Sequence, residues 1–252
     1  MILTFKQTNR WPLLVIAAFA GLALAPVAGA QDKASVTSAS ASTPAKPAFR
    51  SIWNPTNAVP LINSRFTDNF DNGPSSSWSF WEDADGGPYE HAVTNGELVL
   101  ENSRAILGRA HWTNYVVRVR IYLESAKPWG HELAGIELRR MPENPKKRGS
   151  LSWYDLELAC IGGRPHEVYI NVGYYDESGS LKQDGLAAKE SALAFNKWFT
   201  LEFEVKGSRL RGYLDGEMVV EAEDQRLPQG GVLLQAFRTR ARFDDFSVQL
   251  LP

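Results

Sequence analysis

Cysteine is almost absent from this chain, because Cys160 is the only one among 252 residues. A single cysteine excludes an intrachain disulfide. Cys160 ends an alternating apolar run that also contains Tyr154, Leu156 and Leu158. We therefore expect a buried, inert thiol that packs as a small hydrophobe.

Motifs for metal binding and for nucleophilic catalysis are also missing. The four histidines show neither H-x-x-x-H nor H-E-x-x-H spacing, which argues against a zinc site. The sequence contains no G-x-S-x-G and no cysteine–histidine motif. Asp83, Asp85 and Gly86 have the spacing of the start of a calcium loop, but the later ligands of such a loop are absent.

The one long apolar run lies at the N-terminus. Lys6 and Arg10 precede apolar residues 12–24, and Ala28-Gly29-Ala30 has the form of a signal-peptide cleavage site. The run is shorter than the roughly 20 residues that a membrane span needs, and no cysteine follows it for lipid attachment. We therefore predict that residues 1–30 are a cleaved signal peptide. The mature chain would be periplasmic or secreted, without a membrane span.

The charge balance gives no reason to expect nucleic acid or an anionic membrane as a partner. The chain has 27 basic and 29 acidic residues, and loss of Lys6 and Arg10 with the leader would leave 25 basic residues. The mature net charge is then about −4, without a basic excess for a polyanion. The sequence does not indicate an oligomeric state.

Composition divides the rest of the chain. Residues 31–48 are rich in Ala, Ser, Thr, Lys and Pro, and such a segment cannot bury enough apolar surface to fold. We predict a flexible tether and lead-in over residues 31–60 and one folded domain over residues 61–252.

Short alternating segments separated by turn signals fill that domain. Asn95-Gly96 and Asp215-Gly216 are dipeptides typical of tight hairpins. Four strands can be read between residues 195 and 250, whereas residues 182–195 have the only helical content, as a short helix or a long loop. Ten or more short strands predict an all-β fold, a sandwich of two antiparallel sheets.

The order of motifs resembles a known group of domains. Phe66-Thr67-Asp68-Asn69-Phe70, Tyr213-Leu214-Asp215-Gly216, Gly230-Gly231-Val232 and Phe243-Asp244-Asp245-Phe246 follow one another along the chain. This series resembles bacterial concanavalin A-like jelly rolls, the laminin-G-like and 3-keto-disaccharide hydrolase-type domains, over about residues 62–250. The resemblance implies that this sandwich is a jelly roll with a concave sheet whose outward face holds a glycan. It implies that residues 133–140, 153–160 and 167–174 belong to that sheet.

Two departures from related patterns bear on activity. Leu133-Ala134 replaces the asparagine–serine pair that often precedes the glycine–isoleucine strand in the keto-hydrolase-type members. The segment from Trp153 to Glu157 resembles a truncated form of the family-16 glucanase strand, with Trp153 in place of the nucleophilic glutamate. A retaining mechanism would then lack its covalent step.

The candidate site is a polar face on these strands. Asp155 and Glu157 stand at i and i+2, so their backbones lie roughly 6.5–7 Å apart on one face. Two carboxylates within about 5–9.5 Å suit glycoside hydrolysis, so Asp155, Glu157 and Glu137 are the catalytic candidates. The substrate-binding candidates are polar residues near them and tryptophans that could stack on sugar rings: Arg118, Arg120, Arg139, Trp129, Trp153, Tyr169 and Asn171. The alternative is that these charges form cross-strand pairs on a solvated face.

Three functions stay open at this point. We predict an exported carbohydrate-recognising domain that binds a glycan on its concave sheet. The first alternative is a glycan-cleaving enzyme on the same fold, a hydrolase of the 3-keto-disaccharide type, and the second is a structural or adhesive envelope module. No cofactor is expected apart from a structural Ca²⁺, which the resemblance implies near Asp68, Asp71, Asp244 and Asp245. Turn and capping roles explain these aspartates equally well.

Overall fold

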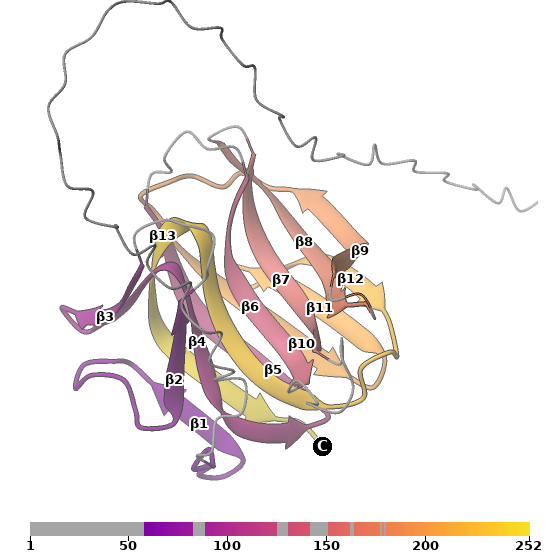
Figure 1. The fold of residues 1–252 in the computed structure, drawn as a ribbon, viewed down its shortest axis with the longest axis horizontal. Coiled ribbons are helices and arrows are strands. Elements are labelled where there is room, and N and C mark those ends of the chain that lie inside the picture. Colours follow the sequence, from indigo (N-terminus) through magenta and orange to yellow (C-terminus); the bar gives the residue numbers. More distant parts are fainter. Residues whose placement is uncertain are drawn as a thin grey trace, which may run out of the picture. The chain divides into compact units, whose positions relative to one another are not determined.

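The computed structural model describes residues 58–82, 89–124, 131–141, 151–161, 164–176, 178 and 180–252 (Figure 1). The predicted leader, most of the predicted tether, Trp129 and the segment 83–86 lie outside the described residues. Every element of the described part is a strand. In chain order the strands are β1 (Arg65–Asp68), β2 (Trp78–Glu82), β3 (Glu90–Thr94), β4 (Glu97–Trp112), β5 (Tyr115–Leu123), β6 (His131–Met141), β7 (Ser152–Ile161), β8 (Arg164–Tyr175), β9 (Leu181–Glu190), β10 (Trp198–Lys206), β11 (Arg209–Leu214), β12 (Glu217–Glu223) and β13 (Gly230–Leu250).

The thirteen strands form two antiparallel layers that share β13. The first part of this long strand pairs with β4 and β6, and its last part pairs with β5, with β1 and, over Arg240–Phe243, again with β4. A register shift between Ala236 and Arg240 separates the two parts. An irregularity of this kind lets a strand bend from one layer into the other. We call β2, β3, β4, the first part of β13, β6, β7, β8 and β9 the concave layer. The second layer contains β12, β11, β10, β5, the last part of β13 and β1.

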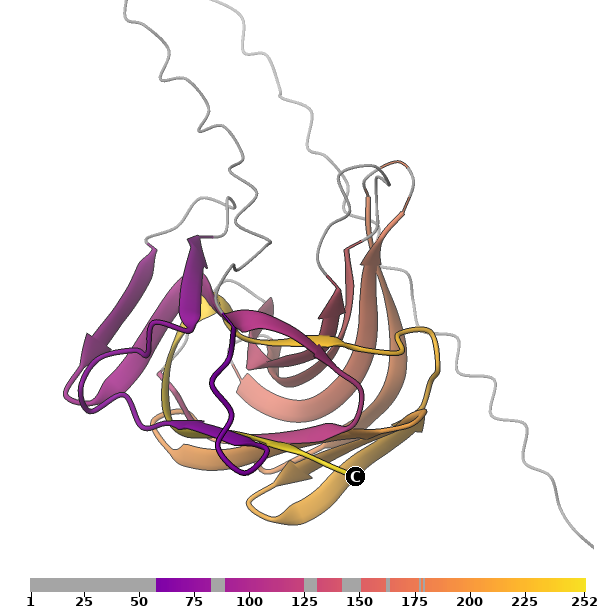
Figure 2. The same cartoon turned by 90° about the horizontal axis from the view of Figure 1, so that it is seen from below.

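The curvature of the concave layer is plain from below (Figure 2). The pink strands β6, β7 and β8 bend round one side of a bowl, and the purple β2 and β3 stand at its opposite rim. The inner face of this bowl points away from the second layer, which therefore covers only the other face of the concave layer. Side chains on one face of the concave layer therefore pack against the second layer, and side chains on the other face line the bowl.

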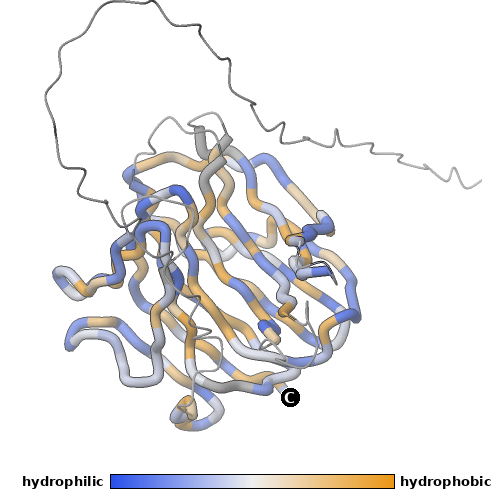
Figure 3. The backbone as a smooth tube through the Cα atoms, in the orientation of Figure 1, coloured by the Kyte–Doolittle hydropathy of each residue, from blue (hydrophilic) through white to orange (hydrophobic). Residues whose placement is uncertain are grey.

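The core lies between the two layers and follows the predicted alternation. In β5 every second side chain from Tyr115 to Leu123 is buried, and β10 repeats this pattern from Phe199 to Val205. Ile136 of β6 and Leu156 of β7 meet them from the concave layer, and both are fully buried. Figure 3 shows the resulting change between apolar and polar residues along these strands. The all-β jelly-roll prediction is confirmed.

Three predicted elements differ from the structure. Residues 182–195 were expected as a short helix or a long loop, but Leu181–Glu190 is β9, which pairs with β8 at the edge of the concave layer. Its mostly exposed side chains carry no alternation, so the hydrogen bonds offered by β8 decide its conformation. Residues 75–81 were expected as a loop, but Trp78–Glu82 is a strand. Separate strands were expected over residues 232–237 and 244–250, but both belong to one strand, Gly230–Leu250. Among the described residues, we find no helix of the length and apolarity that a membrane crossing requires.

Candidate functional site on the concave layer

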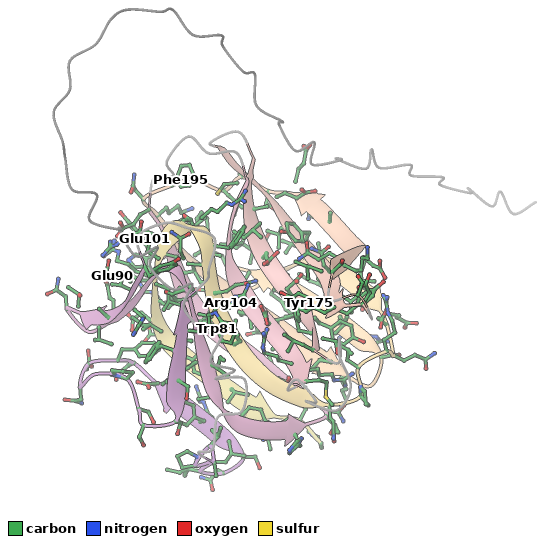
Figure 4. The ribbon with its side chains drawn as sticks, in the orientation of Figure 1. Trp81, Glu90, Glu101, Arg104, Tyr175 and Phe195 are labelled. Atoms are coloured by element: carbon green, nitrogen blue, oxygen red, sulfur yellow. The ribbon has the colours of Figure 1, made fainter. Side chains whose placement is uncertain are left out.

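A polar row crosses the inner face of the bowl. It arises because strand register places residues far apart in sequence directly opposite one another. In Figure 4 Arg104 lies near the middle of this face, with Trp81 beside it. From β2 to β8 the row consists of Trp81, Arg104, Gln235, Gly135, Glu157 and Tyr169.

A second row lies one pleat away and completes a cluster of three carboxyl groups. Glu137 of β6 is opposite Asp155 of β7, and Asp155 is opposite Asn171 of β8. Directly opposite residues have Cβ atoms about 4.5–5.5 Å apart. Five of the predicted site residues, Glu137, Asp155, Glu157, Tyr169 and Asn171, therefore gather on one face.

The three carboxyl groups are buried and hydrogen-bonded, which a solvated face would not require. Glu137 and Asp155 are 0% exposed and Glu157 is 1% exposed. Asp155 Oδ2 accepts the indole N–H of Trp153 at 2.9 Å, and its Oδ1 accepts the backbone N–H of Asn171 at 3.2 Å. The alternative of a solvated face is thus wrong for these residues, because all three are buried.

Each carboxyl group also has a polar partner from another strand or position. Gln235 of β13 donates its amide N–H to Glu157 Oε1. Arg140 donates from its guanidinium to Glu137 Oε2, while Glu137 Oε1 has no hydrogen-bond partner among the described residues. The guanidinium of Arg140 also lies 5.0 Å from the ring centre of Trp153.

Burial raises the proton affinities of both Asp155 and Glu157. Loss of solvent raises the pKa of Asp155 to about 6, against the hydrogen bonds from Trp153 and Asn171. Burial, and next the charge of Asp155, raise the pKa of Glu157 well above its usual range. Two close carboxyl groups of this kind share protons as a pair. Asp155 ionises first because more N–H groups point at it, and Glu157 keeps its proton to higher pH.

The sequence of these strands matches a recognised domain family. The family model of the 3-keto-alpha-glucoside-1,2-lyase-like domain matches residues 65–249, from the start of β1 almost to the end of β13. The chain belongs to this family. A comparison with curated protein sequences gives no match.

Solved structures share the fold of this lyase-like domain at low identity. The kappa-carrageenase from Pseudoalteromonas carrageenovora, in complex with an oligotetrasaccharide, is 15% identical with a TM-score of 0.53, covering 73% of this chain and 92% of its own. A prokaryotic β-1,3-1,4-glucanase from a mouse hindgut metagenome is 14% identical with a TM-score of 0.52, covering 74% and 99%. A structure described under endo-acting O-glycanases of the human gut microbiota is 17% identical with a TM-score of 0.54, also covering 74% and 99%.

Arg139 does not belong to the inner face of the lyase-like domain, contrary to the alternation expected for β6. A register shift after Leu138 leaves Arg139 in the left-handed region, with φ 47°. Its guanidinium points into the sandwich and donates to the carbonyl oxygens of Thr113 at 2.6 Å and Leu227 at 2.7 Å. Because a bulge moves the alternation by one residue, Arg140 takes the place that was predicted for Arg139.

Arg118 and Arg120 also lie elsewhere. Both are on β5 in the second layer, where Val117 and Val119 fill the core and the arginines face outward on the opposite side of the molecule. Arg120 pairs there with Asp244 at 3.4 Å. Period-two alternation correctly predicts their face of the strand, but it cannot tell which sheet the strand joins.

Trp153 occupies the inner face as a packed residue, not as an open platform. Its side chain is 4% exposed, and its indole lies against β8 where Gly173 has no side chain. A Cβ on Gly173 would come within 2.5 Å of the ring. Trp153 therefore covers its own hydrogen-bond acceptor, Asp155.

Arg104, Gln235 and Arg140 were missed by sequence reasoning. The strand after the Asn95-Gly96 turn was expected over residues 97–101, but β4 continues to Trp112 and so includes Arg104. Nothing in the local sequence marks Arg104 or Gln235 as a neighbour of the carboxyl cluster. Arg140 could have been found only by predicting the bulge in β6.

The aspartates considered for calcium make hydrogen bonds and ion pairs within the described residues. Asp68 accepts three N–H groups at 2.9 Å, from the backbone of Phe70 and Ser75 and from the indole of Trp78. Asp245 bonds Arg120 at 3.3 Å. No group of three or more histidine, cysteine or acidic side chains in the described ranges could hold a metal ion. These contacts fit the turn and capping roles.

Proposed function

We propose that this domain binds a glycan on the inner face of its concave layer and eliminates the C1 substituent from a 3-keto-glucoside unit. The observation that carries the proposal is the buried pair of Asp155 and Glu157, which differ in proton affinity. The family description and the carbohydrate-active proteins with the same fold support the substrate class. Buried carboxyl groups with shifted pKa values are found preferentially at functional sites.

The chemistry needs one base and one acid. In a 3-keto-glucoside the C2 hydrogen is acidic because the C3 carbonyl stabilises the enolate that its removal leaves. The enolate then collapses, so that a C1=C2 double bond forms and the bond between C1 and the leaving oxygen breaks. The leaving oxygen needs a proton, which an acid must supply. No water is consumed, so the reaction is an elimination and not a hydrolysis.

Asp155 suits the base and Glu157 suits the acid. With a pKa of about 6, Asp155 is mostly ionised at neutral pH and can accept the C2 proton. Glu157 retains its proton and can donate it to the leaving oxygen. The positive charge of Arg104 favours the ionised form of both groups and would also favour a nearby enolate oxygen.

Access to the pair requires side-chain movement. The Trp153 indole donates a hydrogen bond to Asp155, and the guanidinium of Arg140 lies over the Trp153 ring. Trp153 and Arg140 must therefore move together to admit a sugar ring. The burial of the carboxyl groups is also the observation that favours a second candidate, a glycan-binding domain without catalysis. In that case the sugar would contact only the rim of the bowl.

The test is incubation of the protein with a methyl 3-keto-α-glucoside, followed by the ultraviolet absorbance of the enone product. We expect Asp155→Asn and Glu157→Gln each to reduce turnover by about 10²–10⁴-fold, the usual contribution of a general acid or base. Glu202→Gln, on the outer face of the second layer, is the matched control and should keep full activity. Binding is measured in parallel by calorimetry with the same sugar and with neutral oligosaccharides.

The outcomes separate the alternatives. Binding without turnover in the wild type would favour the non-catalytic glycan-binding domain. Turnover that survives both substitutions would remove Asp155 and Glu157 from the mechanism. A protein that binds none of the sugars would leave the structural or adhesive role.

We also propose that the protein is exported after removal of residues 1–30, on the basis of the apolar run and the small residues that follow it. N-terminal sequencing of the mature protein checks this, with Gln31 expected as the first residue. A mature chain that begins at Met1 would contradict it.

A further inference from the structure

A second concavity lies on the outer face of the second layer, on the other side of the core from the carboxyl cluster. It is a groove with a volume of about 790 Å³. β1, the turn after it, β5 and the last part of β13 form its floor and walls. Arg118 and Arg120, which do not belong to the site on the concave layer, line this groove.

The floor of the groove is a row of hydrogen-bond donors set by strand register. In β13 Phe246 and Val248 fill the core, so Ser247 between them faces outward. Ser247 is opposite Thr67 on one side and opposite Arg118 on the other. Two hydroxyl groups and a guanidinium therefore stand side by side.

Positive charge dominates the available groups that line the groove. Arg65 and Arg118 are both exposed. Arg120 is fixed in place, since its guanidinium lies 4.5 Å from the ring centre of Trp198 and pairs with Asp245 at 3.3 Å. The other lining carboxylate, Asp68, already accepts three N–H groups from its own turn.

Arg118 has one further neighbour that limits its charge. Glu202 of β10 stands directly opposite it, and the two charges attract one another. Arg118 is exposed, and ion pairs at the surface are weak because water and salt screen them, so Arg118 stays able to contact a ligand. Guanidinium groups present their N–H donors in a planar fork that matches carboxylate and sulfate oxygens.

We propose that this groove is a second ligand site that binds an oxyanion, a carboxylate or sulfate group, between Arg65 and Arg118. The volume of the groove is in the range of small-molecule sites, about 300–1,000 Å³, and is much larger than one inorganic anion needs. An acidic sugar would place its anionic group on the guanidinium groups and its ring against Thr67, Ser247 and Asn72. The site does not depend on the elimination proposed for the concave layer.

Calorimetric titration with sodium glucuronate, sodium sulfate and neutral glucose tests this proposal. The wild type should bind glucuronate, and the Arg65→Gln/Arg118→Gln variant should bind it at least tenfold more weakly because it loses two charge-assisted contacts. Arg211→Gln is the matched control. Arg211 lies on β11 of the same layer, pairs with Glu221 and does not line the groove. Raising the salt from about 50 to 500 mM should weaken glucuronate binding, because screening reduces exposed charge interactions.

Each outcome decides the matter. Glucuronate bound more tightly than sulfate supports an acidic sugar, and equal binding supports a site for the anion alone. Glucose bound as well as glucuronate would overturn the oxyanion basis. Unchanged binding by the double variant, with a melting temperature equal to the wild type, would overturn the groove as the site. Absence of any binding by the wild type would overturn the proposal as a whole.

Discussion

Replacing Asp155 by asparagine should increase the stability of the domain at neutral pH relative to its stability in acid. The carboxyl group is fully buried, and its pKa rises from 3.8 in the unfolded chain to about 6 in the folded one. Below pH 3.8 the group is protonated in both states. Between pH 3.8 and about 6 the folded chain holds a proton that the unfolded chain has lost, so stability falls as the pH rises.

The size of this effect follows from the difference between the two pKa values. At about 1.4 kcal/mol per pH unit, ionised Asp155 costs the folded state about 3 kcal/mol at pH 7. About 2–3 kcal/mol of this cost develops between pH 4 and pH 7. For a domain of this length that corresponds to about 5–10 °C in melting temperature.

The measurement is urea unfolding of two proteins at pH 4 and at pH 7. Both carry Glu157→Gln, because glutamine imitates the protonated Glu157 and leaves Asp155 as the only titrating member of the pair. One of them also carries Asp155→Asn. The amide cannot accept both N–H groups that Asp155 accepts, which costs the variant a constant amount at every pH. The effect of the Asp155 charge is therefore measured by how the difference in the free energy of unfolding between the two proteins changes with pH.

A difference that stays constant from pH 4 to pH 7 would refute the reasoning. It would mean that Asp155 is solvated or paired well enough to ionise at its ordinary pKa. If the asparagine variant instead becomes less stable relative to the other protein as the pH rises, the hydrogen bonds from Trp153 and Asn171 outweigh the effect of burial on the pKa of Asp155. In either case Asp155 would also lose its basis as a base with a raised pKa.

Two further substitutions test the packing around the site. Gly173→Ala should destabilise the domain by about 1–3 kcal/mol and change the tryptophan fluorescence, because the new Cβ would displace the Trp153 indole; Gly185→Ala, whose Cβ would meet only ordinary contacts, should do neither, and equal behaviour of both variants in thermal unfolding would contradict this placement. Tyr154→Phe should cost about 1–2 kcal/mol in urea unfolding, because it removes the hydroxyl that donates to Asp224 Oδ1 at 2.7 Å, and an unchanged midpoint would show that water replaces this contact.

Sequence reasoning succeeded where a property depends on near neighbours in the chain. The hairpins at Asn95-Gly96 and Asp215-Gly216 and the buried positions of β5 and β10 follow from turn chemistry and from a period of two. It failed for residues 182–195, where local helix preference was weaker than pairing with β8. It also failed for Arg139, because a bulge adds one residue and reverses every later inference about faces.

The candidate site shows the same division. Asp155 and Glu157 had to share a face, because they are two residues apart on a strand. Their burial could not be inferred, because it depends on residues such as Trp153 and Gln235 that pack over or beside them. The alternative of a solvated face was left open by the sequence, and the structure instead places both carboxyl groups where burial raises their pKa values.

By itself the sequence determined the strands, their turns and the inward or outward direction of most side chains, since these depend on backbone preferences over a few residues. The tertiary structure decided which strands became neighbours. It placed Arg118 on the opposite side of the molecule from Asp155, and it brought Gln235 to Glu157 across 78 residues of chain. Contacts over such separations depend on the pairing of all the intervening strands, so no local pattern records them.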